Sequence, residues 1–154
     1  MPVIVVGADT PIGVAIVEAL RPGAGELRAF VSDPTTIDDL RSRGVKVAVG
    51  DVSDGSHIGG AAMRAFCAVL VPEAAVDDRE RSFADTPTAV LGAWLEGIAD
   101  AGVHRVIWLE DPRFPDAAAM LAGVAAELAA IPTEGRTAAE IAGDVAEREA
   151  RPKV

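Results

Sequence analysis

The chain has 154 residues, enough for one domain with its own core but not for a second domain that binds substrate. Half of the residues are hydrophobic and a quarter are charged, which excludes a disordered chain. The net charge of −10 repels nucleic-acid phosphates and anionic membranes, so we expect neither as a partner. Because no apolar stretch is long enough to span a bilayer, the sequence predicts a single soluble domain over residues 1–154.

The cysteine and histidine content indicates a reducing compartment and no metal site. Cys67 is the only cysteine and lies in an apolar run, so it cannot form an intrachain disulfide and is expected in the core. His57 and His104 are far apart, and neither has a cysteine at ligand spacing. The chain starts with an apolar run at residues 3–6 and has no basic leader or cleavage site, which favours the cytoplasm.

Short apolar runs alternate with segments of helical periodicity, a pattern typical of a parallel sheet with crossover helices. No strand is expected after residue 109. We predict an α/β fold with helices on both faces of a doubly wound five-stranded parallel sheet, in the order 3-2-1-4-5. The predicted strands are residues 3–6, 27–31, 45–49, 67–71 and 103–109, and the predicted helices are residues 12–21, 33–44, 56–64, 88–101, 114–131 and 137–150.

An acidic stretch bounded by prolines, residues 73–85, follows the fourth strand. It is too polar for the core, and it lies where a strand ends and ligand-binding loops usually occur. We therefore expect a mobile loop. Within it, residues 77–81 carry charges of both signs and are interpreted as solvent-exposed.

The last predicted helix begins with a capping-box pair, Thr137 and Glu140. Its apolar stripe consists of small residues, including Ala142 and Val145, which allow another helix to approach closely. The sequence leaves two alternatives open. The helix docks on the sheet of its own chain, or it pairs with a second subunit to form a homodimer.

A glycine-rich turn joins the first strand to the first helix. A diphosphate needs such a turn because backbone amides come close to it and the start of a helix carries partial positive charge. The first glycine makes the turn and the last allows the helix to pack on the strand, but Thr10 replaces the middle glycine that lets a phosphate approach. The turn reads Gly7-Ala8-Asp9-Thr10-Pro11-Ile12-Gly13.

Four further motifs follow this turn in chain order. They are Gly50-Asp51-Val52, Leu70-Val71-Pro72-Glu73-Ala74-Ala75, Thr88-Ala89-Val90-Leu91-Gly92-Ala93 and Gly102-Val103-His104-Arg105-Val106-Ile107-Trp108-Leu109. Together the five motifs resemble those of the extended short-chain dehydrogenase/reductase family, which contains nucleotide-sugar epimerases and dehydratases and is related to the NmrA-like proteins. The resemblance covers residues 3–110 and implies a Rossmann-like, three-layer NAD(P)-binding domain. Residues 112–154 diverge from it.

The resemblance implies a set of cofactor-binding residues. Asp51 would accept a hydrogen bond from the adenine amine, and the segment after the fourth strand would pass beside the cofactor. Asp33 stands at the expected distance for the acid that binds ribose, although capping the helix that starts at Pro34 explains it equally well. No arginine follows the second strand to bind a 2′-phosphate, so NAD is favoured over NADP. The candidates are Gly7, Asp9, Thr10, Pro11, Ile12, Gly13, Ser32, Asp33, Asp51, Val52, Val71, Pro72 and Glu73.

The catalytic residues of that family are missing. Its serine after the fifth strand is replaced by Glu110 and Asp111, the chain has no tyrosine, and Lys46 and Lys153 are its only lysines. Because general acid-base catalysis is worth about 10²- to 10⁴-fold, a bound nicotinamide would be a poor redox catalyst.

Three functions stay open. The chain binds a nucleotide or other small ligand without redox turnover, as a regulatory or accessory protein. Alternatively it is an enzyme in which Glu110 and Asp111 form a reassigned acidic site, or it is a structural protein with an empty cofactor site. The first function requires that the side chains of Thr10 and Pro11 do not plug the crevice at the start of the first helix.

Overall fold

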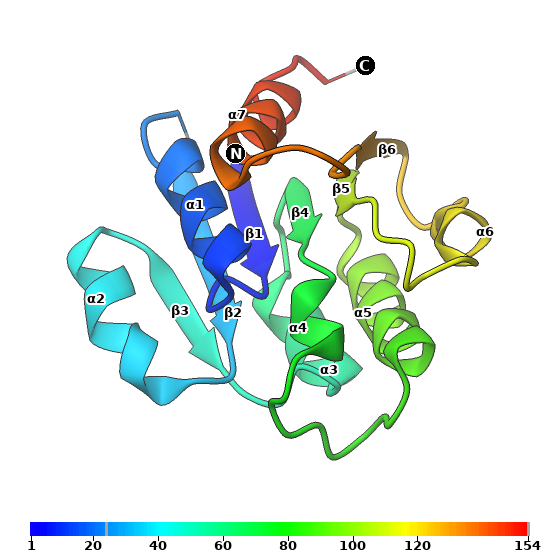
Figure 1. The fold of residues 1–154 in the computed structure, drawn as a ribbon. Coiled ribbons are helices and arrows are strands. Elements are labelled where there is room, and N and C mark those ends of the chain that lie inside the picture. The colour runs from blue at the N-terminus through cyan, green and yellow to red at the C-terminus, as the bar shows by residue number, and fades with distance from the viewer. Residues whose placement is uncertain (24, 154) are drawn as a thin grey trace.

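A computed structural model describes residues 1–23 and 25–153 of the chain (Figure 1). Its six strands form one parallel sheet in the order β3-β2-β1-β4-β5-β6. The fold class and the order of the first five strands are confirmed, whereas the prediction of five strands is wrong because a sixth lies beyond β5. The strands are β1 (Pro2–Val6), β2 (Glu26–Val31), β3 (Lys46–Val49), β4 (Cys67–Leu70), β5 (Arg105–Leu109) and β6 (Glu127–Ile131).

Helices cover both faces of the sheet. Successive residues of a strand point to opposite faces, so a strand that is apolar throughout gives each face a hydrophobic surface for helices to cover. Val3 and Val5 of β1 belong to one core cluster, with α1 and α7, and Ile4 and Val6 belong to the other, with α3 and α5. Cys67 is fully buried, as expected. The helices are α1 (Pro11–Leu20), η1 (Pro34–Thr36), α2 (Ile37–Ser42), α3 (Gly55–Ala61), α4 (Glu73–Val76), α5 (Pro87–Ala101), α6 (Ala117–Leu121) and α7 (Ala138–Glu149).

The sixth strand corrects the prediction of one helix over residues 114–131. Only α6 is helical there, and Gly123 adopts a positive φ of 78° soon after it. The chain then pairs with β5 in parallel, from Glu127 opposite Arg105 to Ile131 opposite Leu109. The alanine-rich run favours a helix by propensity alone, but the edge of β5 offers backbone hydrogen bonds that a strand satisfies.

The segment after β4 is also more ordered than predicted. Residues 73–76 form the short helix α4, in which Ala74 and Ala75 are buried. A Cβ atom on Gly7 would lie 2.9 Å from the Cβ of Ala74. This helix therefore packs directly on the glycine-rich turn, and the expectation of a loop from residue 73 is wrong.

The last helix docks on its own chain. Ile141, Ala142 and Val145 of α7 are buried in the core cluster shared with α1, and the predicted capping box of Thr137 and Glu140 is present. Figure 1 shows α7 beside α1. The stripe that suggested a dimer is thus used within the chain, and the homodimer stays a prediction.

Arg105 fastens the end of α7 to β5. It is 4 % exposed, and its guanidinium donates to four main-chain carbonyl groups at the end of the helix and just beyond it, at distances of 2.8–3.1 Å. Its Nε donates to Glu127 on β6 at 2.6 Å. One side chain thus ties β5, β6 and the carboxyl end of α7 together. Within residues 1–23 and 25–153, no helix has the length and hydrophobicity needed to cross a membrane.

Candidate functional site

The glycine-rich turn has the predicted backbone but satisfies part of its own hydrogen-bonding capacity. Gly7 has a φ of 91°, which favours glycine, and a Cβ on Gly13 would lie 2.1 Å from the carbonyl oxygen of Gly7. Thr10 is the N-cap of α1: its hydroxyl donates to the Gly7 carbonyl at 2.7 Å and accepts from the Gly13 amide at 3.0 Å. The threonine therefore turns inward and occupies an amide that a middle glycine would leave for a phosphate.

The first turn of α1 consequently offers few amides to a ligand. Pro11 has no N–H, and the Gly13 N–H is bound to Thr10. Within the described ranges, Ile12 keeps a first-turn N–H without a partner in the chain. The side chain of Thr10 is 2 % exposed and does not project across the turn.

Asp9 joins the turn to the end of β2. Its carboxylate accepts from the backbone amides of Ser32 at 2.9 Å and Asp33 at 3.1 Å, and its side chain is only 3 % exposed. A buried carboxylate needs a counter-charge as well as hydrogen bonds. That charge comes from Arg79, whose Nη1 lies 3.0 Å from one Asp9 oxygen and 3.2 Å from the other.

Arg79 belongs to the segment that was expected to be solvated. Its Nε and Nη2 each donate to Asp77 at 2.8 Å, and Nη1 lies 3.3 Å from the Ser32 hydroxyl. Burial acts to lower the pKa of Arg79, but its hydrogen bonds and charge interactions with Asp77 and Asp9 raise the pKa above its usual value. The interpretation of residues 77–81 as a solvent-exposed run is therefore wrong for Arg79, whose side chain is 12 % exposed.

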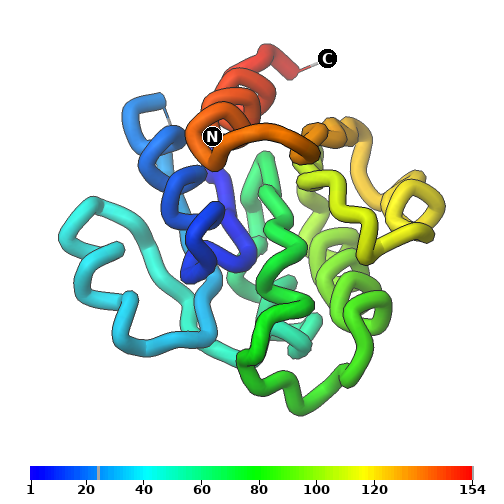
Figure 2. Tube along the Cα trace, in the orientation of Figure 1, coloured from blue at the N-terminus to red at the C-terminus, as the bar shows by residue number. Residues whose placement is uncertain are grey.

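Residues 77–83, here called the strap, are also tied to the loop after β3. The Ser82 amide donates to Asp51 Oδ2 at 2.7 Å, and the Phe83 amide donates to the Ser53 hydroxyl at 3.0 Å. Ser53 in turn donates its amide and its hydroxyl to Asp51 Oδ1. Figure 2 follows the chain from α4 through the strap to α5, past the end of β3.

Asp51 thus supports the strap with both oxygens. Its Oδ2 accepts from Ser82 directly, and its Oδ1 holds the Ser53 hydroxyl that accepts from Phe83. Burial acts to raise the pKa of Asp51, but hydrogen bonds from Ser53 and Ser82 outweigh burial and lower it. The carboxylate predicted to meet an adenine amine therefore stays ionised and already accepts three hydrogen bonds.

A first cavity of about 510 Å³ lies between the strap and the ends of β1, β2 and β3. It brings together four of the predicted site residues. Asp33 lines it while also capping η1 through the Thr35 amide, so the helix-cap interpretation is confirmed. Val52 does not line the cavity: it is buried, and its carbonyl accepts from the Trp94 indole at 2.7 Å. The lining residues are Asp9, Ser32, Asp33, Gly50, Asp51, Asp78, Arg79, Glu80 and Ser82.

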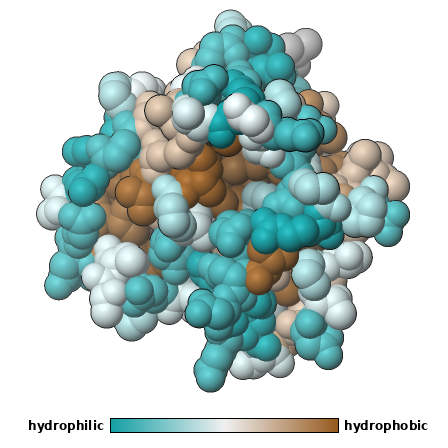
Figure 3. All heavy atoms as spheres, in the orientation of Figure 1, coloured by the Kyte–Doolittle hydropathy of each residue, from teal (hydrophilic) through white to brown (hydrophobic). Residues whose placement is uncertain are grey.

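A second cavity of about 310 Å³ lies on the other side of the turn, between the start of α1 and α7. Both predicted catalytic acids line it. Figure 3 shows hydrophobic side chains gathered in the middle of this face of the molecule, bordered by hydrophilic ones. Val71 lies beneath the turn rather than in the cavity, since its Cβ is 3.1 Å from the position of a Cβ on Gly7. The lining residues are Pro11, Ile12, Pro72, Glu73, Leu109, Glu110, Asp111, Thr133, Ala138 and Ile141.

Arg113 neutralises two of the three acids at the second cavity. Its Nη2 lies 2.8 Å from Glu73 and 2.6 Å from Asp111. Hydrogen bonds from Arg113 hold the pKa of Asp111 below its usual value, although burial acts in the opposite direction. Asp111 therefore stays ionised, and its lowered pKa does not suit a general acid at neutral pH. The carboxylate of Glu110 has no partner within the described ranges, while its main-chain carbonyl accepts from Thr133.

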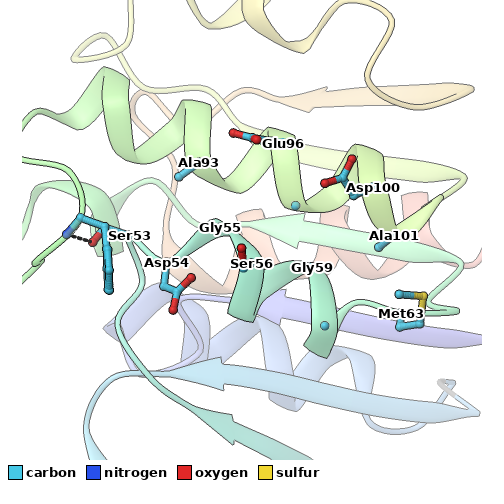
Figure 4. Close-up of a pocket in the computed structure, with 13 residues that line it drawn as sticks. Ser53, Asp54, Gly55, Ser56, Gly59, Met63, Ala93, Glu96, Asp100 and Ala101 are labelled. Carbon is cyan, nitrogen blue, oxygen red and sulfur yellow. Dashed lines mark hydrogen bonds between the residues drawn. The ribbon is translucent and has the colours of Figure 1, made fainter.

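A third hollow, of about 580 Å³, lies between α3 and α5 and contains none of the predicted site residues (Figure 4). Its floor is made of glycines that let the two helices cross in contact. A Cβ on Gly97 would lie 2.3 Å from the carbonyl oxygen of Gly55, and one on Gly59 would lie 3.0 Å from that of Gly97. Figure 4 shows Glu96 and Asp100 on α5 above this floor. Gly55 and Gly59 of α3 thus have a packing role.

Arg79 is the site residue that the sequence interpretation missed. Local charge pattern gave no sign of it, because residues 77–81 also hold three acids and a second arginine. The topology did carry a signal. The carboxyl ends of parallel strands meet at one edge of a sheet, so a loop after β4 passes close to acids that follow β1 and β3.

Comparison with solved structures shows the same fold in several proteins. The chain superposes on the triphenylmethane reductase of Citrobacter sp. with a TM-score of 0.82 and 12% identity, over 99% of this chain and 66% of the other. The anaerobillin reductase of Escherichia coli O157:H7 gives 0.74 and 14%, over 99% and 92%. A nucleoside-diphosphate-sugar epimerase of Staphylococcus aureus gives 0.69 and 17%, over 86% and 50%.

At these identities the comparisons show a shared α/β Rossmann-like fold. The chain spans only part of the Citrobacter reductase and half of the epimerase. Another structure of the Citrobacter reductase, which contains NADP(H), superposes with a TM-score of 0.60 and 17% identity, over 96% of this chain and 46% of the other. No protein-family model and no curated protein matches the sequence.

Proposed function

We propose that the chain binds a nicotinamide dinucleotide, or a related adenine nucleotide, at the carboxyl edge of its sheet and does not oxidise or reduce it efficiently. One observation carries the proposal. The turn between β1 and α1 contributes Asp9 to the first cavity and Pro11 and Ile12 to the second, so a two-ended ligand lying across the turn has a hollow for each end. Open parallel sheets bind ligands at this position.

The residues present fit such a ligand in three parts. The first cavity suits the adenosine end, with the Ser32 hydroxyl and several carboxylates as hydrogen-bonding groups for ribose. The free N–H of Ile12 at the start of α1 suits a diphosphate oxygen. The second cavity, with apolar walls that include Ile12 and Leu109, suits a flat ring. When bound, a nicotinamide ring there would supply hydride chemistry.

Charge in the first cavity favours NAD over NADP. Five carboxylates line it and Arg79 is its only cation among the lining residues, with every nitrogen of its guanidinium already engaged by the chain. A 2′-phosphate would bring two more negative charges among these five carboxylates. A ribose diol carries no such cost.

The proposed lack of turnover follows from the missing proton relay. The chain has no tyrosine, and Lys46 lies at the start of β3, where its ammonium is 2.7 Å from Glu26. This is the opposite edge of the sheet from both cavities, because the strands are parallel. Asp111 stays ionised beside Arg113 and therefore cannot donate a proton at neutral pH.

Binding is tested by thermal unfolding and by calorimetric titration with NAD, NADH, NADP and ADP. A ligand at about 100 times its Kd adds roughly 2.7 kcal/mol to the free energy of unfolding. We expect NAD and NADH to raise the melting temperature, and NADP to raise it less. If no nucleotide at millimolar concentration stabilises the protein, the proposed function is wrong and a structural role is favoured.

A second candidate function is favoured by Glu110. Its carboxylate lines the second cavity without a partner in the described ranges, as a general base would. On this alternative, an activity found in a screen of carbonyl and sugar-nucleotide substrates falls by about 10²-fold or more in Glu110→Gln. Turnover unchanged by that substitution removes Glu110 as a catalytic residue.

A further inference from the structure

The strap is held in place by polar contacts instead of by burial. No residue of the strap belongs to either core cluster, and Phe83 at its end is 68% exposed. Its links to the sheet edge are the contacts of Arg79 with Asp9 and Ser32 and the two amide hydrogen bonds made by Ser82 and Phe83. A segment with few buried apolar contacts opens at low free-energy cost compared with the core.

These links use the same groups that a nucleoside would need. Asp9 accepts from two backbone amides and from Arg79, and Asp51 accepts from Ser53 and Ser82. Of the carboxylates that line the first cavity, Asp9 and Asp51 are thus already engaged while the strap is closed. Both oxygens of Asp9 are occupied, so an adenine amine or a ribose hydroxyl gains a full hydrogen bond to Asp9 only if Arg79 gives one up.

The two arginines of the strap have different positions. Arg81 donates to the carbonyl oxygens of Ala74 and Asp77, at the end of α4, and so braces the base of the strap. Arg79 reaches away from α4 to Asp9 on the turn and to Ser32 at the end of β2. Loss of the Arg79 contact would therefore leave the strap held to the sheet edge by the amides of Ser82 and Phe83, while its base stays in place.

We propose that the ion pair of Arg79 with Asp9 is a latch, which holds the strap across the first cavity. A nucleotide enters this cavity only when the ion pair opens. The inference rests on the proposed function and adds a step that controls when the nucleotide can enter. The charge of Arg79 alone would suggest that it binds phosphate. As part of the latch, Arg79 instead limits access to the site.

Hydrogen exchange of the ¹⁵N-labelled full-length chain tests the latch without any ligand. In Arg79→Met, the amides of Ser82 and Phe83 should exchange roughly ten- to a hundredfold faster than in the wild type, the range expected from losing hydrogen bonds between charged groups. The Val71 amide, bonded to Val6 in the core, should be unchanged. Unchanged exchange at the two strap amides would overturn the latch.

Titration of the same proteins with NAD tests the ligand role. Arg79→Met should bind NAD at least tenfold more tightly than the wild type, whereas Arg21→Met should not differ from it, because Arg21 pairs with Glu18 on the surface of α1. Equal or weaker binding by Arg79→Met overturns the latch but leaves the proposed function standing. If neither protein binds NAD although the strap amides exchange faster, the proposed function fails and the ligand role of the latch fails with it.

A second variant, Arg79→Lys, keeps the test decisive if Arg79→Met does not fold. Arg79→Met leaves Asp9 buried without a counter-charge, which could unfold the chain. Arg79→Lys keeps the charge but cannot contact Asp9 and Asp77 in the same forked geometry. It should show exchange at Ser82 and NAD affinity between those of the wild type and of an open strap. Wild-type values for both would overturn the latch.

Discussion

Thr10 both stabilises α1 and withholds an amide from a ligand, so replacing it by glycine should have opposite effects on stability and on binding. In Thr10→Gly the Gly13 N–H loses its partner and should become available to a ligand at the carboxyl edge of the sheet. The backbone at residue 10 has φ −94° and ψ 159°, which glycine adopts without strain. The substitution also restores the middle glycine of the motif.

The structure sets the size of both effects. The N-cap bond contributes up to about 1 kcal/mol, and the buried methyl group of Thr10 contributes about 0.8 kcal/mol. The free energy of unfolding should therefore fall by about 1–2 kcal/mol. A hydrogen bond from the freed Gly13 amide to a phosphate is worth about 1.5–3 kcal/mol, so the Kd for NAD should fall by about ten- to a hundredfold.

The assays are urea unfolding and calorimetric titration with NAD, and Thr10→Ser is the matched control. Serine keeps the hydroxyl that bonds to Gly7 and Gly13 and loses only the methyl group. It should lose about 0.8 kcal/mol of stability and gain no affinity. If Thr10→Gly binds NAD no more tightly than Thr10→Ser, the reasoning about the withheld amide is refuted.

Three further outcomes are expected. Gly97→Ala should lower the stability by about 1–3 kcal/mol in urea unfolding, because its Cβ would lie 2.3 Å from the carbonyl oxygen of Gly55. Gly92→Ala on the same helix, whose Cβ would lie 3.9 Å from its nearest neighbour, should instead stabilise by about 0.5–1 kcal/mol, and equal effects would contradict the account of the crossing. Arg105→Met should cost about 3–5 kcal/mol by the same assay and speed hydrogen exchange at the end of α7; a loss below about 1 kcal/mol would show that this anchor contributes little. The folded-state pKa of Asp111 is lowered, so its contribution to stability is present above the unfolded pKa of about 3.9 and is lost as the pH falls through the folded pKa. As the pH is lowered from about 5 to about 2, the free energy of unfolding of the wild type, measured with urea, should fall more than that of Asp111→Asn. Parallel curves of this free energy against pH would count against the ion pair.

The sequence was sufficient for the layers and for the order of five strands. Each of those strands is a short segment rich in β-branched or other apolar residues and bounded by turn residues, so its position in the chain was visible. The glycines of the first turn were equally informative, since Gly7 and Gly13 occupy positions where a side chain would clash.

The sixth strand was not predictable in the same way. Its sequence, ELAAI, has a strong helix former at nearly every position, and its burial alternates: Ala129 and Ile131 are buried, while Leu128 is 46% exposed. Alternation between alanine and leucine carries almost no polarity contrast. The strand forms because β5 has an open edge, which is a property of the tertiary structure.

The sequence indicated several residues that line the cavities but not how they are arranged. The acids at positions 9, 33 and 51 do line one cavity, yet what links Asp9 to Asp51 is the strap, which binds the first through Arg79 and the second through the amide of Ser82. Pairwise contacts of this kind depend on how a loop folds back over the sheet, and periodicity does not encode them.

The most direct test of the central claim is the ¹H–¹⁵N spectrum of the full-length chain during titration with NAD. We expect the Ile12 amide to shift most, together with the amides of Ser32 in the first cavity and Glu110 in the second. A spectrum unchanged at millimolar NAD, or shifts confined to the hollow between α3 and α5, would contradict it.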